Sequence, residues 1–85
     1  MVVATEHPHI VRNSKILGGE PVIKGTRTPI RAIVELWKWG NSPEQTREHF
    51  PHVKLSQIFD ALSYYADHRE EIERHIRENC RPSSF

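Results

Sequence analysis

A thirteen-residue stretch rich in glycine, proline and β-branched residues constrains the fold of this chain more than any other segment. It reads Gly18-Gly19-Glu20-Pro21-Val22-Ile23-Lys24-Gly25-Thr26-Arg27-Thr28-Pro29-Ile30. Val22 and Ile23 are typical of a short strand, and Gly25 ends that run where a positive φ is expected. Thr28 can then cap a helix that begins at Pro29. The stretch therefore predicts a strand, a tight turn and a helix start in succession, which is a scaffold and not a reaction centre.

The segments on either side complete a hairpin and a first helix. Residues 1–9 show no sustained hydrophobic period, so we expect a flexible N-terminus there. Residues 10–12 predict a second strand, joined to the first through a turn at residues 13–14 and the Gly-Gly bend. Apolar residues then recur at the i, i+3, i+4, i+7 spacing of one helix face, at Ile30, Ile33, Val34 and Trp37. Gly40 predicts the end of this helix.

Two further helices follow in close succession. Ser42, Pro43 and Gln45 form a capping-box pattern that predicts a short helix, and Pro51 requires it to end near residues 49–50. The next helix has a predicted apolar face made of Leu55, Ile58, Phe59, Leu62, Tyr65 and Ala66. Its predicted polar face holds Ser56, Gln57, Asp60, Ser63 and Tyr64.

A last helix is predicted from His68 to about Asn79, with Ile72 and Ile76, one helical turn apart, as its buried pair. Asp67 and Glu70 resemble another capping box, which favours a break near Asp67 over one long rod. The expected fold class is mainly α: a short N-terminal β-hairpin followed by a helix-turn-helix, winged-helix-like domain of three to four helices. This single domain spans residues 10–79, and residues 80–85 are expected to be a flexible tail.

Composition points to a small intracellular protein that pairs with another chain. Eighty-five residues with a hydrophobic fraction of 36% provide only a modest core, so a homodimer or another partner would add burial. The single cysteine, Cys80, excludes an internal disulfide. We find no export leader and no apolar run long enough to span a membrane, and we expect a cytoplasmic location.

The formal charge is nearly balanced along the chain. Residues 1–66 carry eight Lys/Arg and six Asp/Glu, a net charge of +2. Residues 67–79 carry three and five, a net charge of −2. A solvated surface explains this small imbalance as well as a binding footprint does, so charge gives nucleic-acid binding only weak support.

The helix pair predicted around Pro51 has the outline of a helix-turn-helix, in which the second helix presents its polar face to the DNA major groove. Lys54, Ser56 and Gln57 would then reach phosphates or base edges, and Arg47 would hold the DNA backbone. Asp60 on the same predicted face would repel phosphate. A helical hairpin whose polar face meets only water fits the spacing equally well.

The remaining chemistry-bearing residues favour structural roles. Arg27 is expected to pair with Glu20 or Glu35, or else to face a phosphate. The histidine pairs at 7 and 9 and at 49 and 52 lack the further ligands of a zinc site, so we expect no metal and no other cofactor. Cys80 has no neighbouring base, and nothing else in the sequence indicates an enzyme.

Aromatic residues divide between core and surface. Trp37 matches the buried face of the first helix, whereas Trp39 falls off it and would provide an exposed patch for a second chain. Of the adjacent tyrosines, one is expected to turn inward, and Tyr64 to be available to a partner.

Several blocks of the sequence together resemble a known family, the small bacterial proteins that carry domain of unknown function 433. The resemblance covers about residues 9–76 and rests on Gly19-Glu20-Pro21-Val22-Ile23-Lys24-Gly25-Thr26-Arg27, Gly40-Asn41-Ser42, Pro51-His52-Val53-Lys54-Leu55-Ser56-Gln57-Ile58 and Ala61-Leu62-Ser63-Tyr64-Tyr65-Ala66-Asp67-His68-Arg69-Glu70-Glu71-Ile72. Thr28 stands where this family usually has an aliphatic residue, and Lys54 where it often has Thr.

The resemblance implies a helix-turn-helix fold and, in many relatives, a neighbouring gene for a PIN-like ribonuclease toxin. We therefore expect an antitoxin that binds promoter DNA as a dimer through Arg47, Lys54, Ser56 and Gln57. The last helix and tail, residues 70–85, are expected to meet the toxin through Arg74, Arg77 or Arg81, and Trp39 and Tyr64 are expected to contact a partner chain. The rival hypothesis is a protein-interaction subunit that binds no DNA.

Overall fold

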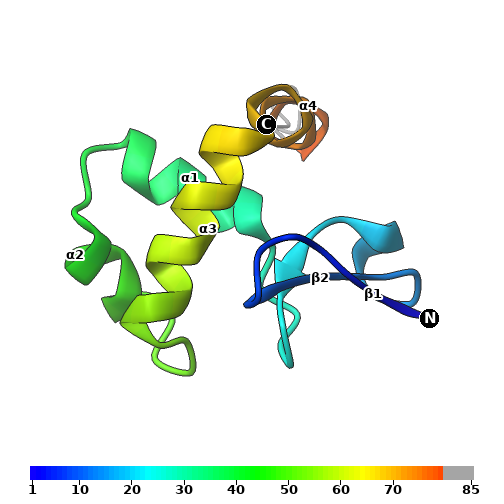
Figure 1. Cartoon of the computed structure of the whole chain (residues 1–85). Coiled ribbons are helices and arrows are strands. Elements are labelled where there is room, and N and C mark those ends of the chain that lie inside the picture. The colour runs from blue at the N-terminus through cyan, green and yellow to red at the C-terminus, as the bar shows by residue number, and fades with distance from the viewer. Residues whose placement is uncertain (80–85) are drawn as a thin grey trace.

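The computed structural model describes residues 1–79, which form a three-stranded antiparallel sheet followed by four α-helices (Figure 1). The elements are β1 (Val2–Ala4), β2 (Ile10–Asn13), the 3-10 turn η1 (Leu17–Gly19), β3 (Val22–Ile23), α1 (Ile30–Lys38), α2 (Pro43–Glu48), α3 (Leu55–Asp67) and α4 (Arg69–Asn79). The predicted class, a hairpin followed by a mainly helical domain, is confirmed.

The sheet contains one more strand than the sequence predicted. β2 lies in its centre and pairs with both β1 and β3, with Val3 opposite Arg12 and Val11 opposite Val22. The prediction that residues 1–9 lack fixed structure is therefore wrong. The hydrogen-bonding edge of β2 that faces away from β3 provides partners for β1, a strand of three residues, which is too short to show a hydrophobic period.

The connection from β3 to α1 differs from its predicted form. Gly25 has the expected positive φ, at 80°. However, α1 begins at Ile30 with Pro29 as its N-cap, and Thr28 does not cap the helix. Instead, the Thr28 hydroxyl lies 2.7 Å from Nε2 of His52, because the loop that precedes α3 packs beside this turn.

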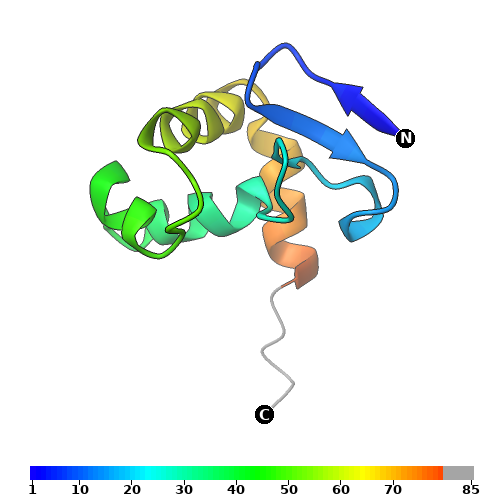
Figure 2. The same cartoon turned by 90° about the horizontal axis from the view of Figure 1, so that it is seen from below.

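The core lies between the sheet and helices α1, α3 and α4, and these three helices contact one another (Figure 2). Fully buried side chains come from every layer: Ile10 and Ile23 from the sheet, Ile30, Ile33 and Val34 from α1, Ile58, Ala61, Tyr64 and Tyr65 from α3, and Ile72 from α4. Helical spacing predicted the α1 and α4 members correctly. For α3 it predicted Ile58 and Tyr65 but missed Ala61 and Tyr64.

Two aromatic residues that the spacing placed in the core are about half exposed. Trp37 is 43% exposed and packs edge-on against Tyr65, and Phe59 is 50% exposed. Phe59 follows the buried Ile58 and is therefore rotated by about 100° around α3. The contact surface of each helix is thus narrower than its apolar stripe.

The capping box at the start of α2 is present as predicted. The Gln45 backbone N–H donates to the Ser42 hydroxyl at 3.1 Å, and the Ser42 N–H donates to the Gln45 side chain at 2.9 Å. We expect Ser42→Ala to destabilise the protein by about 1 kcal/mol, because an N-terminal N–H loses its partner. Urea unfolding would measure this loss, with Ser63→Ala on the exposed middle of α3 as the control that changes stability little.

Helices α3 and α4 meet at a break, also as predicted. His68 has φ −131° and ψ 45°, which ends α3 one residue before α4 begins. Across residues 1–79, none of the helices has the length and apolar character that a membrane span requires.

Candidate functional site

Two of the predicted DNA-binding cations line one open groove between α2 and α3. Arg47 comes from the last turn of α2, and Lys54 is the residue that precedes α3. Both side chains are exposed. Glu44 and Glu48 of α2 line the same groove, so its charge is mixed. The groove therefore presents two cations beside the start of α3, with two carboxylates on its α2 side.

The start of α3 holds the other two predicted residues in different environments. Ser56 is exposed. Gln57 is half-buried, and its side-chain oxygen accepts a hydrogen bond from the Lys54 backbone N–H at 2.8 Å. This bond pairs the Lys54 N–H, which lies at the start of the helix where backbone N–H groups lack partners within the helix. The Lys54 side chain has no acceptor atom with which it could cap the helix itself. Gln57 thus fixes the first turn of α3, and its amide NH₂ remains the group that can donate outward.

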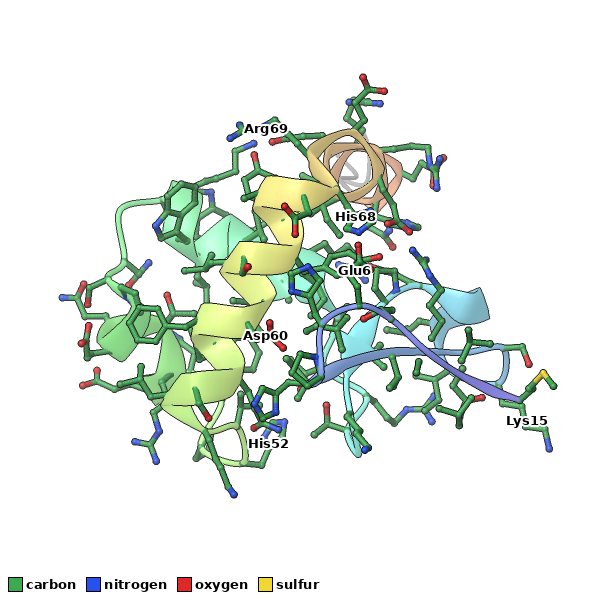
Figure 3. The ribbon with its side chains drawn as sticks, in the orientation of Figure 1. Glu6, Lys15, His52, Asp60, His68 and Arg69 are labelled. Carbon is green, nitrogen blue, oxygen red and sulfur yellow. The ribbon has the colours of Figure 1, made fainter. Side chains whose placement is uncertain are left out.

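Asp60 does not lie on the outward face of α3, contrary to the prediction. Its side chain is only 13% exposed and turns towards the segment between β1 and β2 (Figure 3). One carboxylate oxygen lies 3.0 Å from Nδ1 of His7, and the other accepts the His9 backbone N–H at 2.9 Å. The predicted repulsion between Asp60 and a phosphate in the groove is therefore absent.

Tyr64 is fully buried, so its predicted role as an exposed partner-binding residue is wrong. Its ring stacks on His68 with a centroid distance of 4.2 Å. Its hydroxyl accepts a hydrogen bond from Arg12 and donates one to Glu71 at 2.9 Å. Burial and the Glu71 carboxylate raise the pKa of Tyr64 well above its usual value. Residues 1–9, which were not predicted to be ordered, cover the face of α3 on which Tyr64 lies.

The other predicted partner residues are exposed where the structure describes them. Trp39 is 75% exposed at the end of α1. Arg74 and Arg77 line an open surface of α4 together with Arg69, Glu70, Glu71 and Glu73. Nε of Arg74 lies 3.9 Å from a Glu78 oxygen, a weak surface pair. Arg81 lies outside the described residues.

Glu20 pairs with a different arginine from the one predicted. Nε of Arg31, on the first turn of α1, lies 2.7 Å from a Glu20 oxygen, and both side chains are largely buried. Arg27 is exposed. The Glu20–Arg31 pair links the segment before β3 to α1. This is the structural role that was expected of Arg27.

A polar network that the sequence analysis did not foresee connects the sheet to α3 and α4. Arg12 of β2 donates to both oxygens of Glu71, one of them at 2.9 Å, and also to the Tyr64 hydroxyl. Burial would raise the pKa of Glu71, but hydrogen bonds from Arg12 and Tyr64 outweigh it and leave the pKa below its usual value. One sequence signal was available for the polar side of α3: Asp60 and Asp67 are seven residues apart, two helical turns, and so share a face.

Comparisons with known proteins agree on one family. The model of the family described as "Protein of unknown function (DUF433)" matches residues 10–65. A crystal structure of a DUF433 member protein from Anabaena variabilis is 25% identical to this chain, with a TM-score of 0.75. The alignment covers 81% of this chain and 68% of that one. No curated protein matches the sequence.

Proposed function

This chain belongs to the DUF433 family of proteins of unknown function, and we propose that it is a non-enzymatic antitoxin that binds promoter DNA as a dimer and masks a PIN-like ribonuclease. The observation that carries the DNA-binding part is the groove between α2 and α3. Arg47 of α2 and Lys54, the residue before α3, line it, Ser56 is exposed beside it, and Asp60 is turned away. Exposed cations beside the start of such a helix suit contacts with DNA phosphates.

The helix pair also has the shape that the proposal needs. α2 is six residues long and α3 thirteen, and the two pack against each other with the start of α3 open to solvent. In a helix-turn-helix, the N-terminal residues of the second helix meet the base edges while the first crosses the DNA backbone. Ser56 and the amide NH₂ of Gln57 would then read bases, and Arg47 and Lys54 would hold phosphates.

Fluorescence anisotropy with the DNA upstream of the gene tests this proposal. We expect Arg47→Ala/Lys54→Ala to bind about tenfold or more weakly and to lower the salt slope of binding by about two, since two phosphate contacts are lost. Lys15→Ala/Lys24→Ala removes the same charge from exposed turns of the sheet region and is the matched control (Figure 3). Equal binding by the groove variant and the wild type would refute the DNA contact.

The toxin-binding part of the proposal assigns Arg74, Arg77 and Arg81 to an acidic ribonuclease site. Guanidinium groups form strong paired hydrogen bonds with carboxylates and could compete for the metal-binding acids of such an enzyme. We expect Arg74→Ala/Arg77→Ala to weaken inhibition of the co-expressed ribonuclease while leaving DNA binding unchanged. Inhibition that survives this double change would remove α4 from the toxin interface.

A second candidate function is a protein-interaction subunit that binds no DNA. It is favoured by Glu44 and Glu48 in the groove, which would oppose phosphates, and by the exposed Trp39. Salt separates the two candidates, because DNA binding through several phosphates weakens steeply as salt rises, whereas a contact built on Trp39 barely responds. A partner complex that resists about 0.5 M salt, roughly three times physiological ionic strength, but is lost in Trp39→Ala would support the second candidate.

A further inference from the structure

Two acid–histidine dipeptides from opposite ends of the chain meet above the α3–α4 corner. Glu6-His7 lies between β1 and β2, and Asp67-His68 spans the break between α3 and α4. They pair crosswise: Nε2 of His7 lies 2.9 Å from an Asp67 oxygen, and Nε2 of His68 lies 2.8 Å from a Glu6 oxygen. Figure 3 shows Glu6 beside His68 at this corner. One donor atom each from Glu6, His7 and His68 lie within 4.8 Å of one another.

Both imidazole rings are held in place by other groups. His7 is only 7% exposed, and its Nδ1 contacts Asp60 at 3.0 Å. The His68 ring stacks on the buried Tyr64. A carboxylate that accepts the Nδ1–H of a histidine fixes its tautomer and makes Nε2 a better metal ligand. Asp60 stands in that position relative to His7.

The contact between His7 and Asp67 requires a positive charge. If Nδ1–H of His7 donates to Asp60, a neutral ring presents the lone pair of Nε2 to a carboxylate oxygen 2.9 Å away. Two acceptors at this distance repel unless a cation lies at the contact, either a second ring proton or a metal ion.

We propose that Glu6, His7 and His68, with Asp67 as a fourth ligand, bind one divalent transition-metal ion of the zinc class, and that Asp60 orients His7 for it. Two imidazole nitrogens and two carboxylates are a donor set that suits Zn²⁺. The sequence predicted no metal site, because His7 was expected to lie in a flexible N-terminus. The inference is independent of the antitoxin proposal, since none of these residues lines the groove between α2 and α3.

Side-chain movements are needed to complete the coordination: ligand atoms of Glu6, His7 and His68 already lie within 4.8 Å of one another, whereas Asp67 contacts His7 from outside this group and has to turn towards it. Tetrahedral zinc with bonds of about 2.0–2.2 Å separates its ligand atoms by roughly 3.4 Å. Each crosswise contact therefore has to open by about half an ångström. Glu6 and Asp67 can provide this movement, because their side chains are 60% and 58% exposed. The metal would fasten the β1–β2 segment to the corner of α3 and α4, so its role would be structural.

Zinc titration of the full, tag-free chain after EDTA treatment tests the proposal. We expect isothermal titration calorimetry to give one Zn²⁺ per chain, with Zn²⁺ raising the melting temperature and Mg²⁺ leaving it unchanged. Glu6→Ala and His68→Ala should each bind Zn²⁺ at least about tenfold more weakly. His49→Ala removes an exposed histidine outside the cluster and should bind as the wild type does.

Histidine NMR signals of the wild type give a reading that does not depend on the variants folding. Zn²⁺ should shift the ring resonances of His7 and His68 and leave those of His49 and His52 in place. Absence of Zn²⁺ binding by the wild type, shifts at the other histidines instead, or His68→Ala binding as tightly as His49→Ala would each overturn the site. The cluster would then be a metal-free set of hydrogen bonds in which His7 donates to both Asp60 and Asp67.

Discussion

Replacing Ile58 with alanine is expected to destabilise the protein by about 2–5 kcal/mol. Ile58 is fully buried in the first turn of α3, within the core cluster to which the sheet, α1 and α4 also contribute. The truncated side chain loses its transfer free energy and leaves a cavity that a close-packed core fills only in part. Since domains of this kind are stable by roughly 5–15 kcal/mol, the variant would lose a large share of its stability.

Urea unfolding followed by circular dichroism measures this effect, and the next residue provides the control. Phe59 has a larger apolar side chain than Ile58, yet it is 50% exposed. Phe59→Ala should therefore lower the free energy of unfolding by less than about 1 kcal/mol. Sequence spacing placed both residues in the core. If Phe59→Ala proved as damaging as Ile58→Ala, the rotation of α3 about its axis described above would be wrong.

Glu71→Ala should have the second largest effect, a loss of about 2 kcal/mol at neutral pH. The change removes the acceptor for Arg12 and for the buried Tyr64 hydroxyl, which leaves polar groups without partners at the junction of sheet, α3 and α4. The side chain of Arg12 is 34% exposed and can turn partly to water, which limits the loss.

Glu70→Ala is the matched control for this variant. Glu70 and Glu71 both lie in the first turn of α4, so both interact favourably with the helix dipole. Glu70 is exposed, and the difference between the two variants isolates the network around Arg12. Equal losses in chemical denaturation would mean that the network contributes nothing beyond the dipole.

The same network predicts how the effect depends on pH. The folded-state pKa of Glu71 lies below its usual value of 4.5, so the carboxylate contributes stability that is fully present above that value. This contribution is lost as pH falls below 4.5 and through the folded-state pKa. The stability gap between wild type and Glu71→Ala should therefore shrink in acid, in unfolding curves recorded between neutral pH and pH of about 3.

Local signals in the sequence predicted the four helices of this protein. Pro43 with its capping residues fixed the start of α2, Pro51 fixed its end, and apolar spacing identified α1, α3 and α4. These signals are local, since each depends on residues within one or two turns of one another. The groove between α2 and α3 could be expected for the same reason, because Arg47 and Lys54 lie close together in the chain.

The conformation of the N-terminal segment, and which helix faces it buries, follow from tertiary contacts that the sequence pattern does not show. Asp60 and Tyr64 looked like outward residues of an amphipathic helix, and His7 like part of a loose end. Their contacts join residues far apart in the chain: His7 meets Asp60 and Asp67 across 53 and 60 positions, and Arg12 meets Glu71 across 59. Helical periodicity shows which side chains share a face, but which face is buried depends on the segment that packs against it.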